Sequence, residues 1–406
     1  MASPIPYGRQ WIDDDDIAAV VECLRGDWLT QGPAVERFEQ SLRDATGARH
    51  AVAVASGTAA LHLAALAAGV GPGDIGLTSA ITFTASANCV AYCGGDPHFI
   101  GIDPATGLMD ISLLEARVRE LANKGTPPKV IVPVDLAGQP ADLPAVRRIA
   151  DTVGALVIED AAHSLGARYT HNNTTFRAGS CEHTDFAILS FHPVKHVTTA
   201  EGGAVLTNNP ELATKLRDLR THGIHRDPKR LTRPDEGPWY YEQASLGFHY
   251  RLSDMQCALG ISQMKKLEAF VVRRNEIAAR YDDAFAKAPF AGKIVPLKKT
   301  EHLNRNAYHL YVIRLMRQPG ETLDAVAARR KALFLNLRER GIIPQVHYIP
   351  VPMQPYYRDK LGRLDDGSRE YYASCLSIPM YPKMTDGDVA RTIDTLAECI
   401  NAGDNR

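Results

Sequence analysis

Residues 190–204 read SFHPVKHVTTAEGGA and place one lysine, Lys195, between two apolar stretches. The stretches 186–191 (FAILSF) and 203–206 (GAVL) have the composition of buried strands. Lys195 is therefore expected on a short loop at a strand end, where open α/β sheets bind their ligands. Apolar walls disfavour an ammonium ion and leave an amine that can attack a carbonyl. A loop lysine is more often an ordinary surface residue, so a catalytic role for Lys195 depends on motifs elsewhere in the chain.

The length and charge of the chain limit the classes of protein to which it can belong. Its 406 residues are enough for two domains, one large and one small. The 46 Lys and Arg nearly balance the 47 Asp and Glu, which makes nucleic acid and anionic membranes poor partners. The first residues do not resemble a signal peptide, and no apolar run is long enough to span a membrane. We predict a cytoplasmic protein with a small or phosphorylated substrate.

The cysteines and histidines do not form a metal or disulfide pattern. The seven cysteines are odd in number and include no CxxC pair, which favours buried free thiols. His192 and His196 have zinc-like spacing, but Pro193 interrupts a helix there and a third ligand is missing. We predict no metal site. The chain also lacks a P-loop and a GxGxxG motif after a strand, so nucleotide hydrolysis and a Rossmann dehydrogenase are not supported.

Strands and helices alternate along the first two thirds of the chain. Strands are expected at residues 50–55, 75–79, 99–103, 130–134 and 155–160, and helices at 59–69, from 84, at 112–123 and at 143–153. With the two strands around Lys195, this gives about seven strands in a wide, mostly parallel, doubly wound sheet. A helical arm is expected at residues 10–47. Residues 224–246 show no hydrophobic period and are expected to form a long functional loop.

The last third is expected to form a small C-terminal α+β domain. A helix from Leu252 toward Tyr281 would link it to the large domain. Strands are expected at residues 309–315 and 345–349, and helices near 322–340 and 386–400. We predict that residues 1–264 form an N-terminal arm and the large, cofactor-binding domain, and that residues 265–406 form the linking helix and the small domain.

Two further motifs lie at predicted strand ends. Ser56, Gly57 and Thr58 connect a strand to a helix, and the free N–H groups at such a helix start can hold a phosphate. The same residues could instead serve only as a helix cap. The strand at 155–160 ends in Asp160, with His163 three residues later. Charged groups at a buried strand end are costly unless they are used.

These motifs resemble, in the same order, those of the DegT/DnrJ/EryC1/StrS sugar aminotransferases. The matching segments are SGTAAL, IEDAAH, SFHPVK and TTAEGG, and the resemblance extends from WLTQG (28–32) to VHYIP (346–350). It implies a pyridoxal 5′-phosphate (PLP)-dependent transferase of fold type I, like aspartate aminotransferase. It also implies a homodimer whose active site is shared between subunits.

The resemblance assigns roles to residues of the large domain. Lys195 corresponds to the lysine that binds the cofactor covalently and carries the proton, and Asp160 to the carboxylate that bonds the pyridine nitrogen. His163 stands where the family has Gln or His near the 3′-oxygen of the cofactor; a satisfied core histidine is the alternative. The remaining implied cofactor contacts are the phosphate cup and the aromatic ring that stacks on the pyridine: Gly57, Thr58 and Ser190, and Phe83. An ordinary core phenylalanine is the alternative for Phe83.

Other implied contacts come from the small domain or from the partner subunit. His347 and Tyr348 resemble residues on the substrate side. Arg251 falls among residues that the partner contributes. His249 departs from the family, which usually has an Asn there that reaches across the dimer to the cofactor phosphate, so the substitution puts that contact in doubt.

Within the family, three segments resemble the transaminases of pseudaminic acid biosynthesis: FHPVK, GPWYYEQ (237–243) and VHYIPVPMQPYY (346–357). The implied reaction moves an amino group from glutamate, through pyridoxamine 5′-phosphate, to C4 of a UDP-linked 4-keto-6-deoxy-N-acetylhexosamine. Another nucleotide 4-keto sugar is the alternative. A sugar dehydratase is a second alternative, but the relatives with that activity have His in place of the lysine. A non-catalytic homologue is a third, but such a protein would not need Lys195 and Asp160. The diphosphate of the substrate is expected near His347 and the basic segment 222–233.

Overall fold

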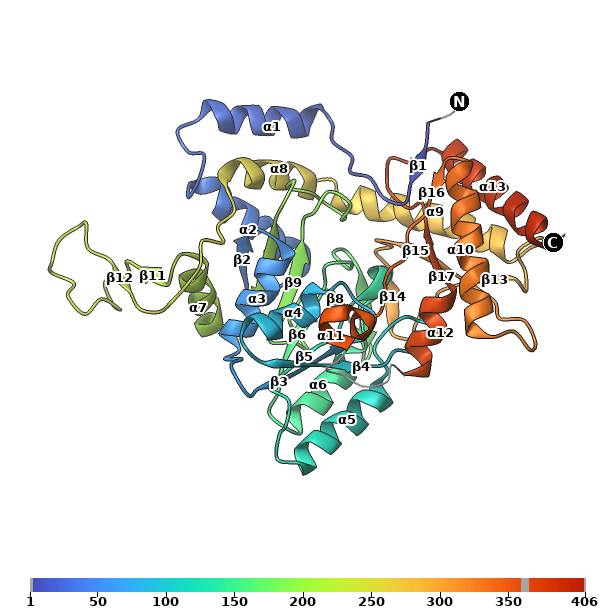
Figure 1. Cartoon of the computed structure of the whole chain (residues 1–406). Coiled ribbons are helices and arrows are strands. Elements are labelled where there is room, and N and C mark those ends of the chain that lie inside the picture. Colours follow the sequence, from blue (N-terminus) through green and yellow to red (C-terminus); the bar gives the residue numbers. More distant parts are fainter. Residues whose placement is uncertain (1–2, 359–364, 405–406) are drawn as a thin grey trace.

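A seven-stranded sheet forms the centre of the large domain (Figure 1). The computed structural model describes residues 3–358 and 365–404. The strand order is β2-β10-β9-β6-β5-β3-β4; β10 is antiparallel to both neighbours, and the other pairs are parallel. The strands are β2 (His50–Val54), β3 (Ile75–Ser79), β4 (Asp96–Ile100), β5 (Val130–Val132), β6 (Leu156–Asp160), β9 (Phe186–Ser190) and β10 (Gly203–Thr207). The predicted fold class, with about seven mostly parallel strands, is confirmed.

Helices cover both faces of this sheet. Val130 and Val132 pack in one cluster with α3 (Gly57–Ala67), α4 (Ala85–Tyr92) and α7 (Pro210–Arg220). Ile131, between them, packs on the other face with α5 (Ile111–Asn123) and α6 (Leu143–Asp151). Because both faces are buried, the inner strands are apolar throughout rather than alternating. β4 was expected at 99–103 but begins at Asp96, since an edge strand can start with polar residues.

The small domain has its own sheet and core. Strands β13 (Ile294–Pro296), β15 (Tyr311–Leu315) and β17 (Cys375–Ile378) form an antiparallel sheet, in the order β13-β15-β17. It packs with α10 (Leu323–Glu339) and α13 (Asp386–Asp404); α12 (Asp366–Ser374) packs against α10. The strand expected at 345–349 is wrong. Gln345 makes one isolated bridge to Ser377, and the chain then becomes a wall of the cavity described below.

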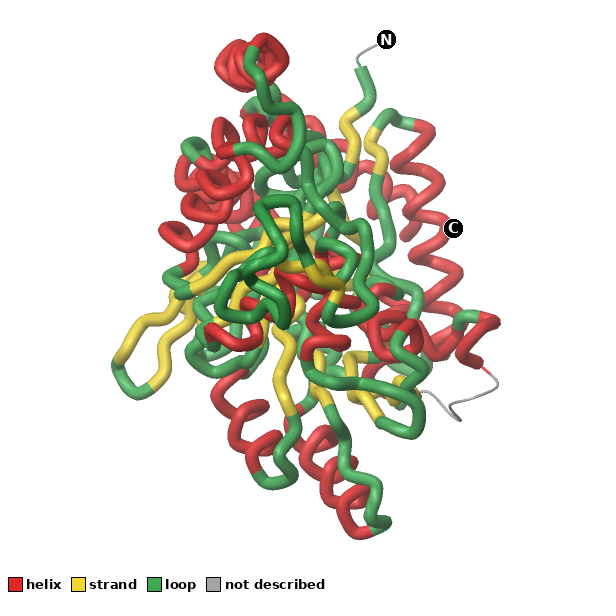
Figure 2. Tube along the Cα trace, turned by 90° about the vertical axis from the view of Figure 1, so that its left-hand side faces the viewer, coloured by secondary structure: helices red, strands yellow, loops and turns green. Residues whose placement is uncertain are grey.

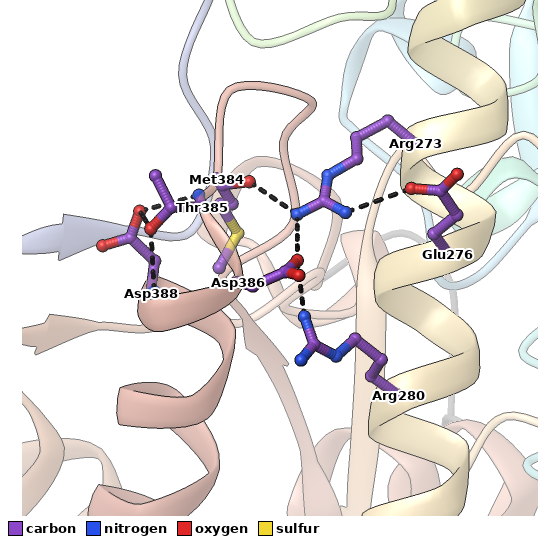
Figure 3. Close-up of polar contacts among 7 residues, drawn as sticks. All are labelled: Arg273, Glu276, Arg280, Met384, Thr385, Asp386 and Asp388. Carbon is purple, nitrogen blue, oxygen red and sulfur yellow. Dashed lines mark hydrogen bonds and ion pairs between the residues drawn. The ribbon is translucent and has the colours of Figure 1, made fainter.

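The single helix expected between Leu252 and Tyr281 is two helices, α8 (Asp254–Met264) and α9 (Leu267–Phe285). The predicted domain boundary falls in the turn between them. The start of α9 packs with the large domain and its end with the small domain. Figure 3 shows Arg273 and Arg280 of α9 paired with Asp386 at the start of α13, at 2.8 and 2.5 Å. The linking helix is thus fixed to both domains.

The N-terminal residues pack on the small domain before the chain enters the large one. β1 (Ile5–Pro6) pairs in parallel with β16 (Ile342–Ile343), and the two lie side by side below the N-terminus in Figure 2. The helical segment predicted at residues 10–47 follows as α1 (Asp14–Arg25) and α2 (Pro33–Thr46). α1 is the uppermost helix in both views and stands away from the sheet, against α8 (Figures 1 and 2).

Smaller elements complete the fold. A second sheet, β14 (Leu303–Arg305), β7 (Arg168–His171) and β8 (Thr174–Arg177), was not predicted. The predicted loop 224–246 projects from the body, with β11 (Ile224–His225) and β12 (Glu242–Gln243) paired at its base (Figure 1); we call residues 224–243 the arm. A short helix, α11 (Pro355–Arg358), lies near α4. Across residues 3–358 and 365–404, no helix combines the length and the apolar character that crossing a bilayer would require.

Candidate active site

A cavity of about 370 Å³ lies at the carboxyl ends of the central strands, and the small domain closes one side of it. Nine of the eleven predicted site residues line it: Gly57, Thr58, Phe83, Asp160, His163, Ser190, Lys195, His347 and Tyr348. Its size is in the range of cofactor and ligand pockets. The structure therefore brings together residues from both domains that the sequence places up to about three hundred positions apart.

Lys195 lies in the turn that follows β9, as predicted, with its N–H bonded to the His192 carbonyl at 2.9 Å. Burial lowers the pKa of its ammonium group to about 8, and the nearby Asp160 carboxylate opposes that shift. A lysine with this pKa is partly an uncharged amine near neutral pH. It can therefore act as a nucleophile and as a base in the cavity.

Asp160 ends β6 and is 6% exposed. Its carboxylate accepts a hydrogen bond from Ser86 Oγ at 2.6 Å and one from the N–H of Ala162 at 3.3 Å. Burial raises its pKa above the ordinary value, although Ser86 and Lys195 oppose the shift. A protonated nitrogen in the cavity would favour the ionised carboxylate, as a pyridine nitrogen of a cofactor would.

The start of α3 forms a cradle for an anion. Ser56 caps the helix through a bond from Ala59 N–H to its hydroxyl at 3.0 Å, which leaves the first N–H groups, at Gly57 and Thr58, directed outward. A Cβ at Gly57 would lie 3.0 Å from the Cβ of Ser190. A Cβ at Gly203 would lie 2.5 Å from the carbonyl of Ser56. A side chain at Gly57 would crowd Ser190 at the cradle, and one at Gly203 would clash with the backbone of the turn, so both glycines keep this turn in place, which fits a bound phosphate.

Phe83 is 57% exposed although it lines the cavity. This exposure argues against an ordinary core phenylalanine, since an apolar ring gains by burial. Its ring centre lies 6.2 Å from that of Tyr348. A flat ligand between these walls could therefore cover the ring.

Burial favours the neutral form of two histidines of the cavity, His163 and His347. Burial lowers the pKa of His163 well below its usual range and that of His347 to about 3. His347 Nδ1 is 2.8 Å from the Ser377 hydroxyl. A neutral His347 offers a diphosphate a hydrogen bond rather than a positive charge, and the expected position of the diphosphate near it stays a prediction.

Two cavity residues, Tyr7 and His309, and one residue that supports the cavity, Ser86, were missed by the sequence analysis. Tyr7, from the N-terminal segment, lies with its ring 5.0 Å from that of His347. His309 packs against His163 with ring centres 4.3 Å apart, and Ser86 holds Asp160. Only Ser86 carried a signal, because it is the second residue of the helix that follows Phe83. Tyr7 and His309 reach the site through tertiary packing that no local pattern reports.

Two predicted residues, His249 and Arg251, lie outside this cavity. His249 is exposed, bridges Thr221 and has its ring 5.6 Å from that of His222. Arg251 lines a separate cleft of about 470 Å³. The basic residues of segment 222–233 lie in the arm, which projects away from the body (Figure 1). Their contacts with a cofactor or substrate stay predictions.

The cavity residues fit PLP. Lys195 would hold its aldehyde carbon, Asp160 its ring nitrogen, Phe83 its ring face and the cradle at α3 its phosphate. Within the described part of the chain, no group of three or more His, Cys, Asp or Glu side chains could hold a metal ion.

Comparisons with known proteins agree with this site. The sequence pattern of the DegT/DnrJ/EryC1/StrS aminotransferase family matches residues 10–397. The Bacillus subtilis spore coat polysaccharide biosynthesis protein SpsC is 37% identical over 404 residues, which are 98% of each chain.

Two solved structures are similar over nearly all of the chain. Helicobacter pylori PseC, an aminotransferase involved in the biosynthesis of pseudaminic acid, has a TM-score of 0.86 and 28% identity over 98% of this chain and 100% of its own. The sugar aminotransferase Spr1654 of Streptococcus pneumoniae, in its PLP form, has a TM-score of 0.85 and 29% identity over 98% and 99%. From its site, its fold and its sequence, the chain belongs to the DegT/DnrJ/EryC1/StrS aminotransferase family.

Proposed function

We propose that the protein transfers an amino group from glutamate to C4 of UDP-2-acetamido-2,6-dideoxy-β-L-arabino-hexos-4-ulose, the keto sugar of pseudaminic acid biosynthesis. Family membership makes the chain a PLP-dependent sugar aminotransferase. The amino donor, the sugar and its nucleotide are the proposed part.

The observation that supports transamination is the placement of Lys195 and Asp160 in one cavity beside the exposed ring of Phe83. PLP, when bound, supplies an electron sink. Asp160 would keep the ring nitrogen of bound PLP protonated, which that sink requires. Lys195 has a pKa of about 8, so its amine can take a proton from the reacting carbon and return it.

The similarity to PseC supports a UDP-linked sugar of the pseudaminic type. SpsC, named for spore coat polysaccharide, supports the alternative, another nucleotide 4-keto sugar. A sugar dehydratase is disfavoured by Lys195, and a non-catalytic homologue by the complete set of Lys195, Asp160 and the cradle.

A homodimer with shared active sites is the second part of the proposal. Large apolar side chains are exposed on the arm (Trp239, 70%), just after it (Leu246, 81%) and before α2 (Trp28, 58%). Exposed apolar groups of this size are typical of interfaces. His249 and Arg251, outside their own chain's cavity, would then act at the partner's. The arm would bring its basic residues toward the substrate diphosphate: Arg226, Lys229 and Arg230.

Product analysis with a panel of nucleotide 4-keto sugars tests the proposal. Glutamate and the UDP-N-acetyl sugar should give the 4-amino product at the highest kcat/KM, with KM rising with salt because the diphosphate meets basic residues. A strong preference for dTDP- or GDP-linked 4-keto sugars would reject the sugar assignment. Absence of transamination with every sugar in the panel would reject the function.

A further inference from the structure

A tight turn that contains Ala137 and Gly138 fixes one backbone N–H at the edge of the cavity. Ala137 has a φ of 63°, a left-handed conformation that is uncommon for a residue with a Cβ. Its carbonyl accepts from Leu310 N–H at 3.3 Å, and that of Gly138 accepts from Ala307 N–H at 3.0 Å. A Cβ on Gly138 would lie 2.5 Å from the Tyr308 nitrogen, so the turn is packed closely. The direction of the Ala137 N–H is therefore set by the fold.

This N–H is directed at His163. The distance from the Ala137 nitrogen to His163 Nδ1 is 3.4 Å, and both residues are buried. Burying an N–H group without an acceptor is costly, so Nδ1 must present its lone pair. Since burial keeps this imidazole neutral, its one proton resides on Nε2. The backbone thus selects the tautomer of His163.

The proton on Nε2 has an acceptor in Tyr348. His163 Nε2 lies 3.1 Å from Tyr348 Oη. Because the imidazole donates in this contact, the hydroxyl accepts, and its own proton must point elsewhere. Tyr348 lines the cavity, and no described residue accepts that proton.

We propose that this chain of hydrogen bonds, from Ala137 through His163 to Tyr348, makes the Tyr348 hydroxyl a donor to a ligand oxygen that carries no proton. His163 is then a positioning residue that acts through Tyr348, rather than the group that meets the 3′-oxygen of the cofactor. The acceptor is either the phenolate oxygen of PLP or the keto oxygen of the sugar. The second choice rests on the proposed function.

Nitrogen-15 NMR of histidine-labelled protein tests the tautomer without any substrate. The His163 signals, identified by their loss in His163→Gln, should show a protonated Nε2 and a bare Nδ1 between about pH 6 and 8. Ala137→Gly is the matched control, because it keeps the N–H and accepts the positive φ without strain. It should leave the tautomer unchanged. A proton on Nδ1 in the native protein would overturn the proposal.

A double-mutant cycle tests whether His163 acts through Tyr348. Tyr348→Phe and His163→Leu should each lower kcat/KM about tenfold, the effect of losing one good hydrogen bond. The double variant should fall no more than about twofold below Tyr348→Phe, because the two residues share one interaction. His163→Gln, which retains an N–H donor, should recover most of the loss. If the losses in kcat/KM of the two single variants multiply in the double variant, His163 contacts the ligand itself, which would overturn the proposal.

Separate half-reactions identify the oxygen. If it belongs to the cofactor, Tyr348→Phe shifts the visible absorbance of bound PLP before any substrate is added. If it belongs to the sugar, that spectrum and the glutamate half-reaction stay unchanged and the sugar half-reaction slows. A Tyr348→Phe enzyme unchanged in all three measurements would contradict the proposal. If no UDP-linked keto sugar is aminated while the PLP spectrum still shifts, the proposed function fails and the hydrogen-bond chain stands.

Discussion

At the scale of single residues, Lys195 is defined by what surrounds its amine. The side chain sits in a cavity whose walls come from two domains, and burial brings its pKa down to about 8. The Asp160 carboxylate raises this pKa and so opposes the effect of burial, which leaves both the charged and the uncharged amine populated near neutral pH. A surface lysine would be almost fully charged at neutral pH.

Replacing Lys195 removes the base and the covalent partner of the cofactor but none of the other contacts. Lys195→Ala should therefore keep the fold and bind pyridoxamine phosphate, while turnover falls by several orders of magnitude. Borohydride reduction followed by peptide mass spectrometry should locate PLP on Lys195 in the native protein and on no lysine in the variant. PLP retained covalently at another lysine would contradict the assignment.

The pKa of Lys195 predicts a pH dependence for cofactor capture. Only the uncharged amine attacks the aldehyde, so the rate at which the cofactor-free protein captures PLP should rise as the pH passes through about 8 and then level off. Stopped-flow absorbance measures this rate. A rate that still rises in proportion to hydroxide up to about pH 10 would mean an ordinary lysine pKa.

Asp160 is expected to keep the ring nitrogen of PLP protonated. Asp160→Asn keeps the size and the bond from Ser86 but no longer holds a proton on the ring nitrogen, so kcat should fall by about two orders of magnitude or more. Ser86→Ala is the milder companion, since it removes one hydrogen bond to the carboxylate and should cost about tenfold. Comparable activity of Asp160→Asn and the native enzyme would show that another carboxylate does this work.

At the scale of elements, α2 depends on a residue far along the chain. Asp254, 1% exposed at the start of α8, accepts the N–H groups of Gly32 and Ala34 at 2.8 and 3.0 Å. Gly32 caps α2 without a side chain of its own. The carboxylate therefore performs the capping role that a local Ser or Asp usually has.

Removing that carboxylate should loosen the start of α2. Asp254→Ala leaves two N–H groups without an acceptor, which should cost about 2–4 kcal/mol of stability. Amide hydrogen exchange at Gly32 and Ala34 should accelerate, while exchange in the central sheet is little changed. Asp254→Asn, which keeps one acceptor oxygen, should have an intermediate effect. Unchanged exchange at both amides would contradict this capping role.

The central elements were predictable because their signals are local. The buried runs at β5, β6 and β9 and the motifs at their ends gave the sheet and most of the cavity. The strand expected at 345–349 failed for a physical reason: the adjacent His347 and Tyr348 both line the cavity, so the backbone leaves the sheet after the single bridge at Gln345. Likewise, the break between α8 and α9 falls at Lys265 and Lys266, which interrupt no helical pattern. Contacts such as Tyr7 with His347 depend on packing across the whole chain.

At the scale of the whole molecule, the chain leaves parts of its predicted site outside its own cavity. His249 and Arg251 lie elsewhere, and the arm reaches away from the body (Figure 1). A dimer in which each subunit completes the other's site would account for this arrangement. Such a C2 dimer contains two equivalent, mixed sites.

Mixing two inactive variants tests this arrangement. Lys195→Ala should be inactive in its own cavity, and His249→Asp should place a repelling charge beside the phosphate in the partner's. Refolding the two together should restore about a quarter of native activity, because half of the dimers are mixed and each contains one intact site. In the control experiment, Lys195→Ala is mixed with Asp160→Asn. Each change damages the cavity of the subunit that carries it, so neither site of a mixed dimer is intact and no activity should return. The same lack of recovery with His249→Asp would exclude shared sites.

The pairing of β1 with β16 has a consequence for synthesis on the ribosome. Ile5 is made before the central sheet, whereas its partner Ile342 is made only after the whole sheet. Domains generally fold as they emerge, the N-terminal one first. The sheet can therefore assemble while Ile5 still lacks its neighbour, and Tyr7 enters the cavity wall only when the small domain has been made. A nascent chain stalled before β16 would carry a formed large domain and an open cavity, so the site is completed only after β16 and the cavity residues that follow it have been made.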